Sequence, residues 1–279
     1  MLTLLEVLDR TTEYLGRQGI ERPKFEAQLL LAHVLKTERL QLFMQFDRPL
    51  SEAELAELRE PVRRRGQGEP YAYIVGTQEF WSLDFAVAPG VLIPRPDTET
   101  LVEQALKLLP EGEERFVADV CAGTGCVGIA LAKERPELKV YATELSPAAL
   151  ELLRKNVAAH ELQKRVAVLR GDLLSPIPQH RPIDVVVSNP PYIATGELAG
   201  LAVSKFEPRE ALDGGRDGLA VYRRLVPEAA RRARQAVLME IGHDQGSAVA
   251  ALFEQCGLSQ VEVMKDLAGN DRVVKGLRP

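Results

Sequence analysis

The residues best suited to chemistry are Asn189, Pro190, Pro191 and Tyr192, which follow a run of valines at 185–187. Such a short β-branched run is typical of a strand that is buried on both faces of a parallel sheet. The two proline rings fix φ and remove two amide donors, so we expect Asn189 to be held rigidly at the carboxyl end of that strand. Open α/β sheets bind their ligands at this end.

The four residues offer hydrogen-bond acceptors and an aromatic face. The side chain of Asn189 has a carbonyl oxygen, and the carbonyls of Pro190 and Pro191 have no N–H of their own residue nearby. The turn can therefore accept both hydrogens of a planar –NH₂ group while Tyr192 stacks on the plane of that group. This pattern suggests a site for an amide or amino-purine nitrogen. The alternative is a strand that simply ends in prolines with a capping asparagine.

Strands and helices alternate after Pro110, which is typical of a doubly wound parallel α/β sheet. Two final strands are joined by a turn at 268–270, so the last strand of the sheet is expected to run antiparallel. The sequence thus predicts seven strands, at 115–120, 139–144, 166–170, 184–187, 236–241, 260–265 and 271–275.

Three other strand ends carry residues suited to ligand binding. A turn of small residues follows the first strand, and such a turn lets the backbone approach a ligand near a helix N-terminus. Its glycine spacing is neither that of a dinucleotide site nor that of a P-loop. Glu144 ends the second strand, where a carboxylate can accept both hydroxyls of a ribose. Asp172 and Leu173 follow the third strand, near an adenine-sized pocket. The residues of the turn are Cys121, Ala122, Gly123, Thr124 and Gly125.

The pattern divides the chain into three parts. Residues 1–70 show helical periodicity and predict a small helical bundle, in which Ser51 and Glu54 form a capping box. Residues 71–93 contain short alternating segments and predict a β-hairpin linker. Residues 94–279 form the α/β domain. At its start, Arg95 could orient an acidic group or form a loop-to-helix salt bridge.

Composition narrows the class of protein. No run of about 18 apolar residues occurs and no basic segment opens the chain, so neither a membrane span nor a signal peptide is expected. Three cysteines without a disulfide framework suggest a reducing cytoplasm. Cys121 and Cys126 are interpreted as small turn and helix residues, so no metal site is expected. A net charge of −5 argues against a direct nucleic-acid substrate.

These residues resemble the class I S-adenosylmethionine-dependent methyltransferases, and specifically the HemK/PrmC family of release factor glutamine N5-methyltransferases. The resemblance covers nearly the whole chain. Asn189–Tyr192 is a motif that adenine-N6 methyltransferases share, so it indicates the chemistry better than the substrate. The more specific segments are Ile93-Pro-Arg-Pro-Asp-Thr-Glu99, Phe206-Glu-Pro208, Ala211-Leu-Asp-Gly-Gly215 and Asn270-Asp-Arg-Val273.

The resemblance implies roles for the residues at the strand ends. Cys121 to Gly125 would wrap the methionine part of S-adenosylmethionine, Glu144 would hold the ribose, and Asp172 with Leu173 would border the adenine. Asn189 to Tyr192 would hold the glutamine of the Gly-Gly-Gln motif of class 1 peptide chain release factors, with Asn189 also beside the cofactor. The family usually has glycine where this chain has Cys121, so the thiol must fit beside the cofactor or point away.

The expected reaction is direct in-line methyl transfer to the side-chain amide nitrogen, which supports translation termination and leaves S-adenosylhomocysteine. Asn189 and Pro190 would fix the nitrogen and Tyr192 would stack on it, with no metal or covalent intermediate. Three alternatives remain open. One is a ribosomal-protein glutamine N5-methyltransferase, and another is an adenine-N6 methyltransferase, which would need a basic groove and a flipped base. The third is a binding module that keeps the cofactor fold without catalysis.

Overall fold

The computed structural model describes residues 1–279, apart from the side chains at positions 202 and 203. The chain divides into two compact units, Met1–Gly76 and Thr77–Pro279.

The first unit is helical. Its helices α1 and α4 each begin with a capping box, formed by Thr3 with Glu6 and by Ser51 with Glu54. Each box satisfies two backbone donors at a helix start and stabilises it by about 1 kcal/mol. Leucines such as Leu8 and Leu31 form a buried core of this unit's own. The helices are α1 (Leu4–Arg17), α2 (Pro23–Val34), α3 (Arg39–Leu42), α4 (Glu52–Gly66) and α5 (Tyr71–Val75).

Residues 71–75 differ from the expected hairpin, because they form helix α5. The tyrosines and β-branched residues there are typical of a strand, but Pro70 stands at the helix start and Gly76, at φ +79°, ends the helix in a left-handed conformation. The hairpin begins directly afterwards, with β1 (Thr77–Phe80) paired antiparallel to β2 (Leu83–Ala86). Phe80 and Phe85 pack into the core of the second unit.

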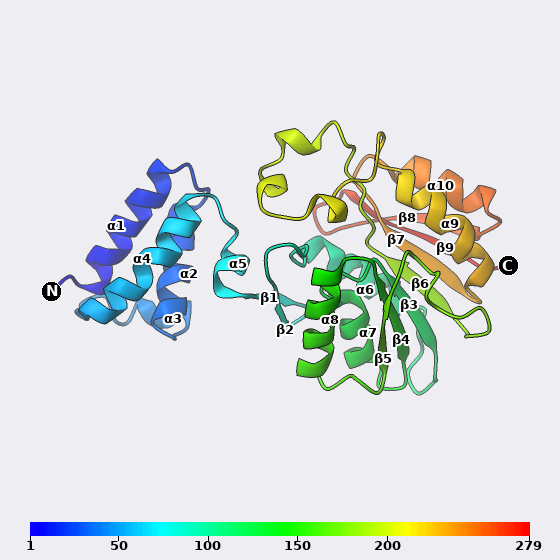
Figure 1. Ribbon diagram of the computed structural model, residues 1–279, viewed down its shortest axis with the longest axis horizontal. Coiled ribbons are helices and arrows are strands. Elements are labelled where there is room, and N and C mark those ends of the chain that lie inside the picture. The colour runs from blue at the N-terminus through cyan, green and yellow to red at the C-terminus, as the bar shows by residue number, and fades with distance from the viewer. The chain divides into compact units, whose positions relative to one another are not determined.

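The second unit is built on the predicted seven-stranded sheet, with strand order β5-β4-β3-β6-β7-β9-β8 (Figure 1). Strand β9 is antiparallel to both of its neighbours, which confirms the expectation for the last strand. The strands are β3 (Phe116–Val120), β4 (Lys139–Glu144), β5 (Val166–Arg170), β6 (Val185–Ser188), β7 (Ala236–Glu240), β8 (Ser259–Lys265) and β9 (Asp271–Leu277).

Helices cover both faces of the sheet. Val185 and Val187 pack into a core with α6, α7 and α8, whereas Val186 packs into a second core with α9 and α10. Figure 1 shows α9 and α10 side by side, apart from the other three. Alternate valines of β6 are therefore buried on opposite faces, as the unbroken valine run predicts. These helices are α6 (Glu99–Leu106), α7 (Cys126–Glu134), α8 (Pro147–Ala159), α9 (Ala220–Arg232) and α10 (Gly246–Gln255).

The register of the parallel strands brings their carboxyl ends to one edge. Val120 of β3 lies opposite Thr143 of β4 and Ser188 of β6, and Ser188 lies opposite Met239 of β7. The turns that follow these strands consequently converge. Among the described residues, no helix is long and apolar enough to cross a membrane.

Two carboxyl groups are buried near this edge. Asp119 of β3 accepts a hydrogen bond from the backbone N–H of Gly128 at 2.9 Å, and Glu240 ends β7 with 1% of its surface exposed. Burial raises the pKa of both side chains to about 7, because a buried carboxylate loses its hydration.

Glu240 is expected to make stability depend on pH. Its pKa in the folded protein lies above the ordinary value of 4.5, so the folded state binds more protons than the unfolded state between pH 4.5 and about 7. The stability that this group contributes therefore falls as pH rises through that window. Glu240→Gln removes the titration, so its melting temperature relative to wild type should become more favourable from pH 5 to pH 8. Glu151→Gln, at an exposed position of α8, is the matched control. A pH-independent difference for Glu240→Gln would contradict the assignment.

Candidate active site

Asn189 lines each of three neighbouring cavities. It follows β6 directly, and the preceding Ser188 hydroxyl donates to the Val120 carbonyl oxygen at 2.7 Å, which fixes the strand end. The Nδ2 atom of Asn189 donates to Oγ1 of Thr98 at 3.2 Å. This asparagine is thus held from two directions while one side of its amide stays open to the cavities.

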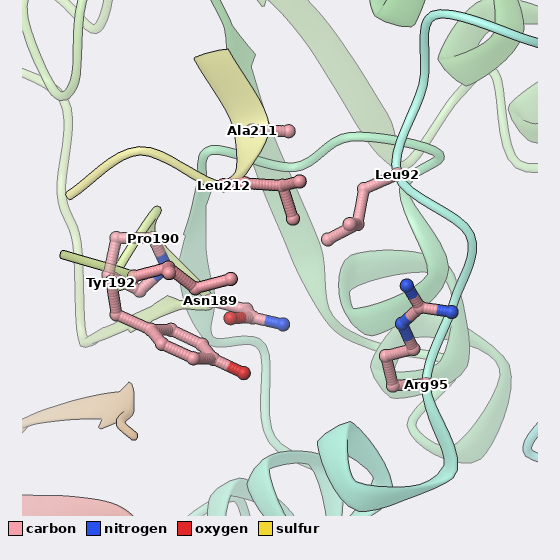
Figure 2. Close-up of a pocket in the computed structure, with 8 residues that line it drawn as sticks. Leu92, Arg95, Asn189, Pro190, Tyr192, Ala211 and Leu212 are labelled. Carbon is pink, nitrogen blue, oxygen red and sulfur yellow. The ribbon is translucent and has the colours of Figure 1, made fainter. Parts of the chain in front are cut away.

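Three motif residues, Asn189, Pro190 and Tyr192, border a cavity of about 90 Å³, in which Asn189 stands between Tyr192 and Arg95 (Figure 2). Leu92, Ala211 and Leu212 supply its apolar walls. A mainly apolar cavity of this size with the Asn189 amide beside it suits a short side chain that ends in a polar group.

The segment 211–218 supports Tyr192 from behind. Ile193 donates to the Leu212 carbonyl at 2.9 Å and accepts from Gly214 at 2.8 Å, and Gln245 Nε2 donates to the Tyr192 carbonyl at 2.9 Å. A Cβ at Gly214 would lie 2.8 Å from the Tyr192 Cα, so only glycine permits this approach. Burial raises the pKa of the Tyr192 phenol to about 12, which keeps it protonated at neutral pH.

Arg95 forms an ion pair with Glu207, at 2.5 Å between Nη2 and Oε2. The Glu207 side chain is almost fully buried, and burial raises its pKa while Arg95 opposes that shift. The ion pair joins the segment before α6 to the loop that carries 206–218. Arg95 thus forms a salt bridge, but its partner lies in a loop and not on a helix as expected.

A larger cavity of about 420 Å³ lies on the other side of Asn189. This volume is in the range of small-molecule sites. Cys121, Gly123, Glu144, Asp172 and Leu173 all line it, so the structure brings these strand-end residues together. Leu145, Pro147, Val221 and Arg224 also line it and had no recognisable motif in the sequence.

The Glu144 carboxylate is oriented by three backbone N–H groups. Its Oε2 accepts from Gly123 at 2.9 Å, and its Oε1 accepts from Leu145 at 2.7 Å and from Ser146 at 2.8 Å. A carboxylate has about four lone-pair sites. One site on Oε2 consequently remains for a hydroxyl group in the cavity, and a second hydroxyl would have to share a site or displace a backbone donor.

Asp172 forms an ion pair with Arg224 of α9. Both side chains are about half exposed, so this contact is a weak one at the cavity rim. Leu173 has φ +50°, an unusual conformation for a branched residue, which turns the chain sharply after Asp172.

The small-residue turn after β3 divides into two parts. Ala122, Gly123 and Thr124 border a narrow cavity of about 40 Å³ together with Asn189. Gly125 is the N-cap of α7 instead, at φ +84°, and a Cβ there would lie 2.2 Å from a Leu153 methyl. Its glycine is thus explained by packing and helix capping.

Cys121 adopts φ +60°, the left-handed conformation that favours glycine. Its side chain packs beside the core under α9 and contributes to the wall of both the narrow and the larger cavity. Burial raises the pKa of the thiol to about 12, and a hydrogen bond with Ser188 opposes the shift. The thiol therefore remains protonated and is accommodated in the wall between the cavities.

Three side chains near Asn189 had no role in the sequence-based prediction of the site. Thr98 lies within the segment 93–99, but its hydroxyl carries no spacing signal of its own. Glu207 lies in a loop. Glu240 is the last residue of β7, as Glu144 is of β4, and lies one residue before the end of the predicted strand, so an acid near a strand end was the signal that could have marked it.

The chain is similar to known proteins over its whole length. Residues 6–76 match the family described as PrmC N-terminal domain, and residues 96–213 match the methyltransferase small domain. The release factor glutamine methyltransferase of Geobacter sulfurreducens is 42% identical over 98% of this chain and 96% of its own length. That of Moorella thermoacetica is 42% identical over 97% of both chains.

A solved methyltransferase from Pyrococcus furiosus shares the fold, with a TM-score of 0.52 and 20% identity over 70% of this chain and 89% of its own. The helical unit, the methyltransferase sheet and the sequence identity over nearly the full length indicate the same family. The chain belongs to the release factor glutamine methyltransferase family.

Proposed function

We propose that this protein transfers a methyl group from S-adenosylmethionine to the side-chain amide nitrogen of the glutamine in the Gly-Gly-Gln motif of class 1 release factors. The observation that carries the proposal is the position of Asn189 between a ligand-sized cavity and a small apolar one. A cofactor on one side and a glutamine on the other would meet at this residue. The full-length relatives at 42% identity support the choice of substrate.

The residues of the larger cavity fit S-adenosylmethionine. Its volume suits the cofactor, the Glu144 Oε2 atom has room for a ribose hydroxyl, and nothing lies within 4 Å of the Cβ position at Gly123. Residues 121–125 would hold the methionine part, and Asp172 with Leu173 would border the adenine. When bound, the cofactor supplies an electrophilic methyl group.

The small cavity would hold the glutamine side chain. Leu92 and Leu212 would contact its methylenes, and Tyr192 would stack on its amide plane. The Asn189 Oδ1 atom and the Pro190 carbonyl would accept its two N–H hydrogens, and Pro191 would keep that carbonyl fixed. An amide nitrogen is a weak nucleophile, so these acceptors favour the positive charge that develops on it. Positioning and preorganised dipoles contribute about 7–11 and 3–4 kcal/mol in favourable enzymes.

Neither Tyr192 nor Cys121 is suited to act as a base at this site. Tyr192 and Cys121 stay protonated at neutral pH, because burial raises the pKa of each to about 12. The proton of the methylated, positively charged amide is acidic and can leave to water. S-adenosylhomocysteine is the second product.

Residues 1–70 are the proposed region of partner recognition. Leu40, Phe43 and Met44, at and just after α3, are exposed apolar side chains of this helical unit, and such a surface is suited to protein contacts. A release factor as substrate also implies action in the cytoplasm, where ribosomes terminate translation.

The substrate is tested by offering labelled S-adenosylmethionine with a class 1 release factor, a ribosomal protein mixture and duplex DNA side by side. We expect label on the release factor, mapped by mass spectrometry to the glutamine of Gly-Gly-Gln. Label on ribosomal protein would identify the sister glutamine methyltransferase, and label on adenine would identify a nucleic-acid enzyme. The net charge of −5 argues against the latter. If no substrate is labelled although the cofactor binds, the remaining alternative is a binding module that keeps the cofactor fold without catalysis.

Asn189→Ala should lower kcat by about 100-fold or more, the scale for removal of one preorganised dipole. The dissociation constant of S-adenosylhomocysteine, measured by calorimetry, should change much less, because Glu144 and the turn at 121–125 remain. Unchanged turnover would remove Asn189 from the reaction.

Glu144→Gln should weaken cofactor binding more than it lowers kcat, which is the reverse of the result expected for Asn189→Ala. The amide places an NH₂ donor among backbone N–H donors, so the bonds that orient this side chain are lost together with an acceptor for the ribose. We expect cofactor affinity to fall at least about tenfold, with a smaller loss of kcat at saturating cofactor. An unaltered dissociation constant would contradict the ribose role.

A further inference from the structure

We propose that Thr98 and Glu240 are positioning residues that fix which end of the Asn189 amide faces the substrate. This inference rests on the proposed role of Asn189 as an acceptor for a substrate –NH₂ group. It assigns a task to two buried side chains that line neither the 90 Å³ cavity nor the 420 Å³ cavity.

The three side chains come from distant parts of the chain. Thr98 is 98% buried at the end of a short 3₁₀ turn (Pro96–Thr98) before α6, and its Oγ1 lies 3.2 Å from Asn189 Nδ2. Glu240 ends β7, the strand next to β6, so its side chain starts at the same sheet edge as Asn189. The Thr98 side chain is hydrogen-bonded to the Glu240 carboxyl.

The number of available protons decides the direction of these hydrogen bonds. A threonine hydroxyl has one proton and two lone pairs, whereas a carboxylate can only accept. Above the pKa of Glu240, which burial raises to about 7, this carboxyl is ionised and the Thr98 proton is donated to it. Towards Asn189 the Thr98 oxygen can then only accept. Only the –NH₂ end of Asn189 can satisfy it, which turns the Oδ1 atom to the other side.

The resulting orientation matches the needs of the small cavity. In Figure 2 the amide oxygen of Asn189 points to the side of Pro190 and Tyr192, and its nitrogen points away from them. With the amide reversed, an –NH₂ group would face the substrate –NH₂, and two donors would oppose each other. Without such a neighbour, the two orientations of an asparagine amide differ little in energy, since its oxygen and –NH₂ ends are nearly equal in shape.

Stability alone does not explain a glutamate at position 240. Its Oε2 atom is buried without a hydrogen-bond partner among the described residues. A buried polar atom without a partner lowers stability. The nearby Arg272 is bonded to Asp266 and to the Ile241 carbonyl instead. A role in orienting Thr98 therefore explains the carboxyl at position 240 better than a role in packing does.

Thr98→Val tests the inference, because it keeps the shape and removes the hydroxyl. We expect kcat for release factor methylation to fall about tenfold, the effect of losing one orienting hydrogen bond. The KM for S-adenosylmethionine should change little. Thr98→Ser restores the hydroxyl and should recover most of the turnover, although it also removes a methyl group from the core.

A double-mutant cycle separates positioning from general damage. If Thr98 acts through Asn189, Thr98→Val should have no further effect on the residual turnover of Asn189→Ala. Equal losses in both backgrounds would show a merely structural role and overturn the inference, as would wild-type turnover in Thr98→Val.

Circular dichroism and S-adenosylhomocysteine binding confirm that each variant is folded. Should Thr98→Val fail to fold, Glu240→Gln and its combination with Asn189→Ala provide the same cycle. If the wild-type protein methylates no glutamine, the proposed function itself is refuted. If the wild type is active and the variants behave as independent, only the positioning role is refuted.

Discussion

The site depends on the alignment of parallel strand ends at one edge of the sheet. Strands β3, β6 and β7 are buried on both faces, so a shift in register by one residue would move an entire set of apolar side chains. That constraint fixes where Cys121, Glu144, Asn189 and Glu240 emerge. The side chains that form the site are thereby held by the packing of residues that take no part in chemistry.

Several unfavourable features gather at this edge. Cys121 and Leu173 have positive φ, and Glu207 and Glu240 are buried carboxyl groups whose pKa burial raises. Each of these costs stability relative to a relaxed or apolar alternative. Their concentration around Asn189 is what is expected when a rigid scaffold keeps reactive groups in one geometry.

Local patterns predict the features that depend on local structure. The valine run at 185–187 predicts a strand, its prolines predict the rigid corner, and the alternation of elements predicts the sheet and its antiparallel last strand. The acids at two strand ends, Glu144 and Asp172, predict a shared cavity, because parallel strands end together. Tyr71–Val75 was the exception, where a glycine and a proline outweigh strand-like residues.

Contacts between distant segments could not be predicted in this way. Thr98 is 91 residues from Asn189, and Arg95 is 112 residues from Glu207, so no spacing rule connects them. The hydrogen bonds that already occupy most of the Glu144 carboxylate likewise depend on the fold of the turn at 121–125. The sequence indicates which groups reach the site, and tertiary contacts decide how they are oriented.

The most direct measurement is a crystal structure of this protein with S-adenosylhomocysteine and a release factor. The account predicts the glutamine amide nitrogen at about 3 Å from both the Asn189 Oδ1 atom and the Pro190 carbonyl oxygen, with Asn189 Nδ2 still bonded to Thr98. A glutamine that lies elsewhere, or that meets the nitrogen end of Asn189, would contradict it.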